Sequence, residues 1–249
     1  ELPRRTGGLP AKYLITLMFP DFYGNPTGPL TFTPRLPGAQ PYNNYNELCV
    51  YTGIAPLFLA ATCLPAWRRR PLILFFLTGA AVCISMAMGS VLYYPLARGL
   101  PGLNLSTPTR ILYLFGFCMA ASSALGADIL LEKRTRRPYV LWGIWGLLLL
   151  VMLSAAAAVQ SESVVRWMAG ITRDADWRHG QALLSAHFSV TSRTLLEPLL
   201  LGLAAWAVVS SLAMNRGGGV RSVLFWALVL ILCLDLMRFG RNYNTTAPR

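Results

Sequence analysis

Long apolar runs separated by short clusters of arginine dominate this sequence. Residues 71–97 contain no charged side chain over 27 positions, residues 138–161 contain none over 24, and residues 48–67 contain none over 20. A helix needs about 20 mostly apolar residues to cross a bilayer. These runs therefore predict a chain that crosses a membrane several times. Its substrates are then expected in the lipid, across it, or along one of its faces.

The strongly positive charge would also suit a nucleic-acid-binding protein. The chain of 249 residues is 55% hydrophobic and 13% charged, with a net charge of +12. Many of its arginines, however, fall at the ends of the apolar runs, where they fix orientation and meet anionic lipid headgroups. The sequence contains no stretch that interleaves basic and aromatic residues as nucleic-acid binding requires. We therefore expect membrane lipid, and not nucleic acid, as a partner.

The pattern predicts an all-α polytopic membrane protein with about six transmembrane helices and long external loops. The expected spans form one domain over residues 48–238, at 48–67, 71–95, 111–131, 139–159, 196–214 and 222–238. Three tight connections, at 68–70, 132–137 and 215–221, together carry nine Lys and Arg residues. Positive charge in short loops marks the cytoplasmic side. Both ends of the chain are therefore expected outside.

The external segments offer the first candidate residues. Residues 1–47 are expected to form an external loop, and residues 20–46 within it are dense in Pro, Gly, Asn and Tyr, which predicts irregular structure. Such loops are often functional, and Asn43, Asn44 and the following Tyr51 have the chemistry to bind a sugar; a solvated linker is the alternative. Residues 160–195 predict either a helix in the outer interface or two surface helices packed over the spans. Residues 239–249 are expected to begin a further external region.

Charged residues near span ends supply other candidates. Arg110 opens a span and is either an anchor for lipid phosphate or a clamp on an anionic substrate, because its planar guanidinium suits phosphate. Asp128 shares a helix face with Ala120 and Ala124, and this spacing predicts an acid that points into the bundle with a basic partner within reach.

Two further pairs are expected from their spacing. Asp235 and Arg238 are three residues apart, which predicts an ion pair on one helix face. Glu197 precedes a proline at the start of a span, where a carboxylate favours the helix dipole. Arg193 lies four residues before Glu197 as its expected partner.

The histidines and cysteines do not predict a metal centre or a disulfide. His179 and His187 are eight residues apart, whereas a helical metal pair needs a spacing of four, so hydrogen bonding is the favoured role. The five cysteines are odd in number, lack CxxC spacing and fall in apolar segments, as small packing residues do. They are Cys49, Cys63, Cys83, Cys118 and Cys233.

Several short motifs follow one another in a recognisable order. They are Phe19–Pro20–Asp21–Phe22–Tyr23–Gly24, Asn46–Glu47, Tyr51–Thr52–Gly53–Ile54–Ala55–Pro56–Leu57, Met88–Gly89, Tyr94–Pro95–Leu96, Leu100–Pro101–Gly102, Pro108–Thr109–Arg110, Asp235–Leu236 and Asn242–Tyr243–Asn244. This order, over residues 19–244, resembles the bacterial YfhO-like family of large membrane proteins. That family is similar to the C-type glycosyltransferases, which take sugars from polyprenyl-phosphate carriers on the outer face.

The resemblance implies a glycosyltransferase of the bacterial cytoplasmic membrane. Its partners would be a polyprenyl-phosphate sugar donor and a glycopolymer or lipid acceptor of the cell envelope. Arg110 and Arg193 would meet the donor phosphate, and Asp21 and Glu47 would act as general base or hold a divalent metal ion.

The resemblance also implies a catalytic acid in an external loop upstream of residue 1, so the chain is expected to be a piece of a longer protein. Two other functions fit the same sequence. One is a transporter or flippase for a lipid-linked or anionic envelope precursor. The other is a noncatalytic scaffold within an envelope-assembly complex.

Overall fold

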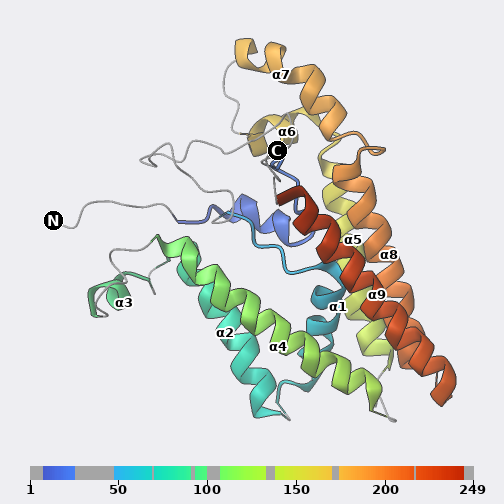
Figure 1. Ribbon diagram of the computed structural model, residues 1–249. Helices are drawn as coiled ribbons and strands as arrows, with labels where there is room; N and C mark the ends of the chain where they lie inside the picture. Colours follow the sequence, from blue (N-terminus) through green and yellow to red (C-terminus); the bar gives the residue numbers. More distant parts are fainter. Residues whose placement is uncertain are drawn as a thin grey trace, which may run out of the picture.

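The structure is a computed structural model that describes residues 8–25, 48–68, 70–90, 93–99, 107–132, 138–169, 174–215 and 217–243. Within these ranges every regular element is a helix, in agreement with the predicted all-α class (Figure 1). The elements, with η marking a 3-10 helix, are η1 (Ala11–Leu17), α1 (Ile54–Thr62), η3 (Leu64–Ala66), α2 (Pro71–Ala87), α3 (Tyr93–Gly99), η5 (Pro108–Ile111), α4 (Leu112–Leu131), α5 (Pro138–Ala158), α6 (Glu162–Ala169), α7 (Asp174–His187), α8 (Arg193–Met214) and α9 (Gly218–Tyr243).

Four helices are long and apolar enough to cross a membrane. They cover Pro108–Leu131, Pro138–Ala158, Arg193–Met214 and Gly218–Arg241. These helices correspond to the predicted spans 111–131, 139–159, 196–214 and 222–238. The last helix is longer than predicted, because it begins at Gly218 and ends only at Tyr243. By their length and composition, these four helices suggest a membrane protein.

The predicted spans 48–67 and 71–95 are too long. Residues 48–53 are not helical, and α1 starts only after Gly53, whose φ of 97° is outside the helical region. The nine residues of α1 make a helix of only about 13 Å. The second run ends at Ala87, because the chain turns at Gly89 with a φ of 68°. Apolar composition predicted both runs but could not locate these turns.

The short helix α1 lies at the centre of the bundle, between the α2–α4 pair and the helices α5, α8 and α9 (Figure 1). Ile54 and Phe58 are fully buried. Neighbouring helices also bond to the backbone of α1, since Ser123 Oγ donates to the carbonyl of Pro56 at 2.8 Å and Trp145 Nε1 donates to that of Phe58 at 3.1 Å. In surroundings without water, such donors satisfy carbonyl groups that would otherwise be costly to bury.

The crossing of α1 and α4 depends on Gly126. A Cβ atom at this position would lie 1.9 Å from the carbonyl oxygen of Leu59, so the two helices approach as closely as they do only because the side chain is absent. The sequence predicted the wrong face of α4 for this contact. The face that packs carries Ser122, Ser123 and Gly126, whereas Ala120, Ala124 and Asp128 are exposed.

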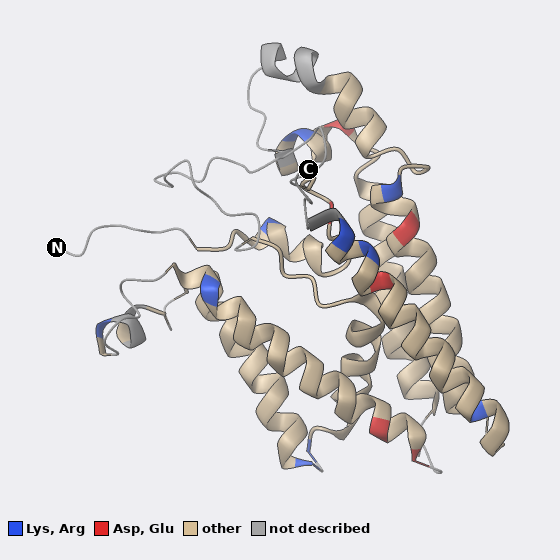
Figure 2. Cartoon of the chain, in the orientation of Figure 1, with Lys and Arg blue, Asp and Glu red and all other residues tan. Residues whose placement is uncertain are grey.

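The arginine-rich connections meet at one end of the bundle. Arg70, just before α2, pairs with Asp128 at 2.9 Å and also with Glu132 at the end of α4. Asp128 therefore points outward to a basic partner and not into the bundle. Arg221 near the start of α9 donates to the carbonyl of Leu130 at 2.5 Å. We call Arg70, Asp128, Glu132 and Arg221 the arginine-rich end; Figure 2 shows charged residues gathered near helix ends.

The opposite end carries η1, α6 and α7. Residues 160–195 contain two helices, and α6 packs on η1, where Lys12 Nζ donates to the carbonyl of Met168 at 3.0 Å. A cation at the last turn of a helix also favours the helix dipole. Residues 11–17 form the short helix η1 within the segment 1–47 that the sequence predicts to be an external loop. Residues 26–47 lie outside the described part of the chain.

Candidate functional site

A cluster of charged and polar side chains lies at the end of the bundle opposite to the arginine-rich end. Arg238 of α9 forms ion pairs with Glu197 of α8, at 2.6 Å from Nε to Oε2, and with Asp21, at 3.8 Å from Nη2 to Oδ2. The side chains of Arg238 and Asp21 are only 23% and 11% exposed. Together with Tyr51 and Asp235 these residues form what we call the Arg238 cluster. It joins the ends of two membrane helices to the segments that precede α1.

Asp235 connects α9 to the start of α1. It is 1% exposed and accepts hydrogen bonds from the hydroxyl of Tyr51 and, at 2.9 Å, from the backbone N–H of Ile54. This N–H is among those at the start of a helix that lack a partner within the helix, and a carboxylate there also favours the helix dipole. The predicted Asp235–Arg238 pair is wrong, because each residue bonds to a different partner.

Tyr51 is a positioning residue in this arrangement. Its hydroxyl donates to Asp235, and its ring packs against Phe239 with 5.0 Å between the ring centres. Because a carboxylate only accepts hydrogen bonds, the hydroxyl of Tyr51 is the donor in this contact. The ring therefore contributes to packing, and the contact with a sugar expected from the sequence stays a prediction.

His187 at the end of α7 borders the cluster. Its Nε2 lies 3.1 Å from the carbonyl of Phe22, and its Nδ1 lies 3.4 Å from the hydroxyl of Thr194. Burial lowers the pKa of His187 and outweighs the Phe22 carbonyl and the charge of Asp21, which both raise it. The ring is therefore neutral near pH 7 and acts through hydrogen bonds, the role that its spacing in the sequence favoured.

The structure brings together only some of the predicted site residues. Asp21 and Tyr51 belong to the cluster, and Arg193 lies at its edge with its Nε 3.8 Å from Oε1 of Glu197 and a side chain 94% exposed. Arg110 is exposed but lies in η5, on the α2–α4 side of the molecule (Figure 1). Glu47, Asn43 and Asn44 lie outside the described residues, in the segment between Asp21 and Tyr51.

Sequence reasoning had not assigned Glu197, Asp235 or Arg238 to the site. The signal that could have found them is their position in or beside apolar runs, where a charge is expensive unless it has a partner. Spacing along one helix correctly predicted the Arg193–Glu197 pair. The closer partners of Glu197 and Asp235, however, come from other helices and from the segments before α1. One sequence without structure does not contain that pairing.

Acidic, histidine and cysteine side chains of the described residues have other partners than a metal ion. This part of the chain contains no group of three His, Cys, Asp or Glu side chains placed to hold an ion, and the carboxylates of the cluster face Arg238, Tyr51 and a backbone N–H. The five cysteines are free thiols, and the Cys63 thiol donates to the carbonyl of Ser122 at 3.1 Å.

Comparison with family models, with curated proteins and with solved structures finds no match to this chain.

Proposed function

We propose that this chain forms part of a membrane glycosyltransferase that moves a sugar from a polyprenyl-phosphate carrier to a polymer or lipid of the bacterial cell envelope. The observation that supports this proposal is the Arg238 cluster, where a mostly buried carboxylate, Asp21, meets the ends of two apolar helices. A donor with a lipid tail and a phosphate requires polar, charged chemistry at such a boundary between bilayer and water.

In the proposed reaction a hydroxyl of the acceptor attacks the anomeric carbon of the sugar. The bond from that carbon to the phosphate oxygen breaks, polyprenyl phosphate leaves, and Asp21 takes the hydroxyl proton as general base. Arg238 and Glu197 position Asp21, and the exposed guanidinium of Arg193 contacts the phosphate of the donor. Glu47, Asn43 and Asn44 belong to the segment expected to meet the acceptor.

The proposed topology places the arginine-rich end in the cytoplasm and the Arg238 cluster outside. In this arrangement α1 and α2 complete six crossings with α4, α5, α8 and α9. The two short helices have 9 and 17 residues, which is less than a full span. Non-helical backbone such as residues 48–53 is tolerated at membrane depth where protein surrounds it, and Asp235 accepts from the N–H of Ile54, the residue that follows this stretch.

Transport of a lipid-linked or anionic precursor is the rival function. Transporters place polar groups near the middle of the bilayer, commonly on broken helices. In the described spans most charged residues lie near helix ends, and Asp235, which lies farther inside α9, bonds to Tyr51 and Ile54. This arrangement favours chemistry at one face over passage through the bundle.

The test is a transfer assay with the intact protein in liposomes, radiolabelled polyprenyl-phosphate sugars and a crude envelope acceptor. Asp21→Asn should lower transfer by about tenfold or more, because the base is lost. Glu162→Gln is the matched control, since Glu162 also pairs with an arginine, Arg166 at 2.6 Å, but on α6 and outside the cluster. Full transfer by Asp21→Asn would remove Asp21 from the reaction. A folded protein that transfers no sugar from any donor would favour transport.

A further inference from the structure

Two buried thiols from different helices are in contact where α2 packs on α4. The side chains of Cys83 in α2 and Cys118 in α4 form a hydrogen bond, and the two residues are 7% and 9% exposed. They are 35 positions apart in the chain, so only the folded protein brings them together. Neighbouring sulfur atoms on two packed helices are the arrangement from which a disulfide can form.

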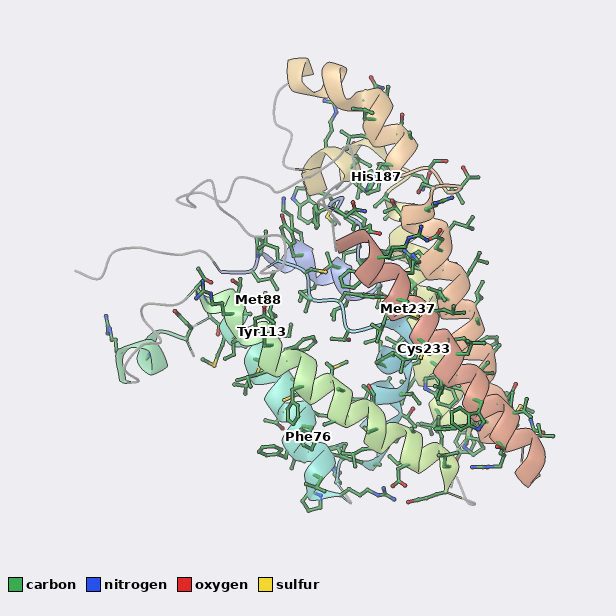
Figure 3. The ribbon with its side chains drawn as sticks, viewed as in Figure 1. Phe76, Met88, Tyr113, His187, Cys233 and Met237 are labelled. Atoms are coloured by element: carbon green, nitrogen blue, oxygen red, sulfur yellow. The ribbon has the colours of Figure 1, made fainter. Side chains whose placement is uncertain are left out.

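The packing of α2 on α4 fixes the position of the Cys118 sulfur. Phe76, Gly79 and Cys83 are spaced by three and four residues, which places them on one face of α2. A Cβ atom at Gly79 would lie 3.0 Å from Sγ of Cys118, so the absent side chain leaves the space that this sulfur needs. Phe76 contacts Phe117 with 6.0 Å between ring centres, and Figure 3 shows Phe76 beside α4. The sulfur of Cys118 is therefore held against two successive turns of α2.

The residues that flank the two cysteines are apolar and exposed. Val82 precedes Cys83 and is 38% exposed, and Phe117 precedes Cys118 and is 64% exposed. Phe117 belongs to the helix Pro108–Leu131, which is long and apolar enough to span a membrane, so its ring is expected to face hydrocarbon. An oxidant that reaches the thiols from this side must therefore dissolve in lipid.

We propose that Cys83 and Cys118 form a redox pair that a lipid-soluble quinone oxidises to a disulfide between α2 and α4. One cysteine, as the thiolate, adds to the quinone ring and forms a carbon–sulfur bond. The sulfur of the second cysteine then attacks the first sulfur, so the sulfur–sulfur bond forms as the carbon–sulfur bond breaks. Two electrons and the two thiol protons pass to the ring, which leaves as the quinol.

The contact between the two sulfur atoms favours the second step, because attack on a neighbouring group of the same molecule is much faster than attack between molecules. The first step needs a thiolate, so oxidation should be faster at about pH 8.5 than at about pH 6.5. The disulfide ties α2 to α4 and restricts movement of one helix along the other. The pair lies apart from the Arg238 cluster, and its oxidation does not depend on whether the protein transfers sugar.

The test counts the thiols of the intact, detergent-purified protein before and after incubation with a short-chain ubiquinone. The protein has five free thiols, so the loss of two should leave three, and digestion should yield linked peptides that carry Cys83 and Cys118. The disulfide should raise the unfolding temperature by about 5 °C, and dithiothreitol should reverse this rise. Oxidised glutathione, which is charged and stays in water, should form few of the linked peptides in the same time.

Two variants show whether the thiols that disappear are those of the pair. Cys118→Ser should keep four thiols with and without the quinone, since one of the five is replaced. Cys233→Ser is the matched control, because Cys233 is an exposed thiol of α9, away from Phe76 of α2 (Figure 3), and this variant should fall from four thiols to two.

The thiol count of the unchanged protein tests the proposal even where Cys118→Ser does not fold. Five thiols after incubation with the quinone, or linked peptides that contain another cysteine in place of Cys83 or Cys118, would overturn the redox pair. Equal yields of the linked peptides with oxidised glutathione and with the quinone would overturn the lipid-soluble oxidant.

Discussion

The two ends of the bundle use the same kinds of charged residues in different surroundings. At the arginine-rich end, Arg70, Asp128 and Glu132 have side chains 33%, 63% and 49% exposed. In the Arg238 cluster, Asp21 and Arg238 are 11% and 23% exposed and Asp235 is 1% exposed. Exposed ion pairs contribute between zero and about 1 kcal/mol, whereas removing one partner of a buried pair costs about 3–5 kcal/mol. The first end is suited to orientation in the membrane, and the second fixes how the segments before α1 meet the bundle.

The largest difference in stability between the two ends is expected when the aspartate of each is replaced by alanine. Asp128 and Asp235 each lie within a helix that can span a membrane, so the two substitutions can be compared directly. Asp235→Ala should destabilise the protein by about 3 kcal/mol, because it leaves the Tyr51 hydroxyl and the Ile54 N–H buried without an acceptor. Asp128→Ala is the matched control and should cost less than about 1 kcal/mol, because Arg70 keeps Glu132 as a partner. Reversible unfolding in mixed micelles measures both free energies.

Equal costs for the two alanine substitutions would contradict the comparison. Tyr51→Phe removes one donor to Asp235 and leaves the carboxylate in place. This change should cost about 1 kcal/mol, so an effect as large as that of Asp235→Ala would show that Tyr51 acts through something other than this hydrogen bond.

Much of the bundle could be predicted from sequence, because apolar runs report burial in lipid directly. The four long helices match four predicted spans. The turns at Gly53 and Gly89 could not be located, since both lie in uncharged runs and a positive φ leaves no mark on hydropathy. The predicted packing face of α4 was also wrong. Alanine and serine are both small, and only the close approach of the Leu59 backbone to Gly126 distinguishes the two faces.

The site was less predictable, because its partners are far apart in the chain. Tyr51 and Asp235 are separated by 184 positions, and a single sequence carries no signal that they bond. Two predictions about the site needed only local sequence features. Asp21 was predicted as an external acid from its position outside the apolar runs, and Arg193 was predicted as the partner of Glu197 from their spacing of four residues. Spacing predicted Asp235 as the partner of Arg238, whereas in the folded protein Arg238 forms ion pairs with Glu197 and Asp21.

Lowering the pH should have an intermediate effect on the stability of the folded protein, and this effect should arise only at the end of the bundle that holds His187. Burial lowers the pKa of His187 from 6.5 in the folded protein, so the unfolded chain binds a proton more readily than the folded one. Stability is then complete above about pH 6.5 and falls as the pH drops below that value. Unfolding measured between pH 7.5 and pH 5 should show this loss.

The pH experiment needs a background protein in which His187 is the only histidine. The chain has two histidines, so His179→Gln provides the background in which the slope of stability against pH is measured. His187→Gln in that background should flatten the slope between pH 7.5 and pH 5. A slope that stays the same would assign the acid sensitivity to other groups and separate His187 from the cluster.

The smallest effect is expected from Arg70→Ala, which removes both ion pairs of the arginine-rich end at once. Their exposure to water limits the loss to less than about 1 kcal/mol, and at about 1 M salt, where the Debye length is about 3 Å, the difference from the unchanged protein should disappear. Arg238→Ala breaks the pairs with Glu197 and Asp21, and its larger cost should persist in high salt, because buried charges are screened much less. If both substitutions cost the same and respond alike to salt, solvent exposure is not what distinguishes the two ends, and the arginine-rich end contributes to stability as well as to orientation.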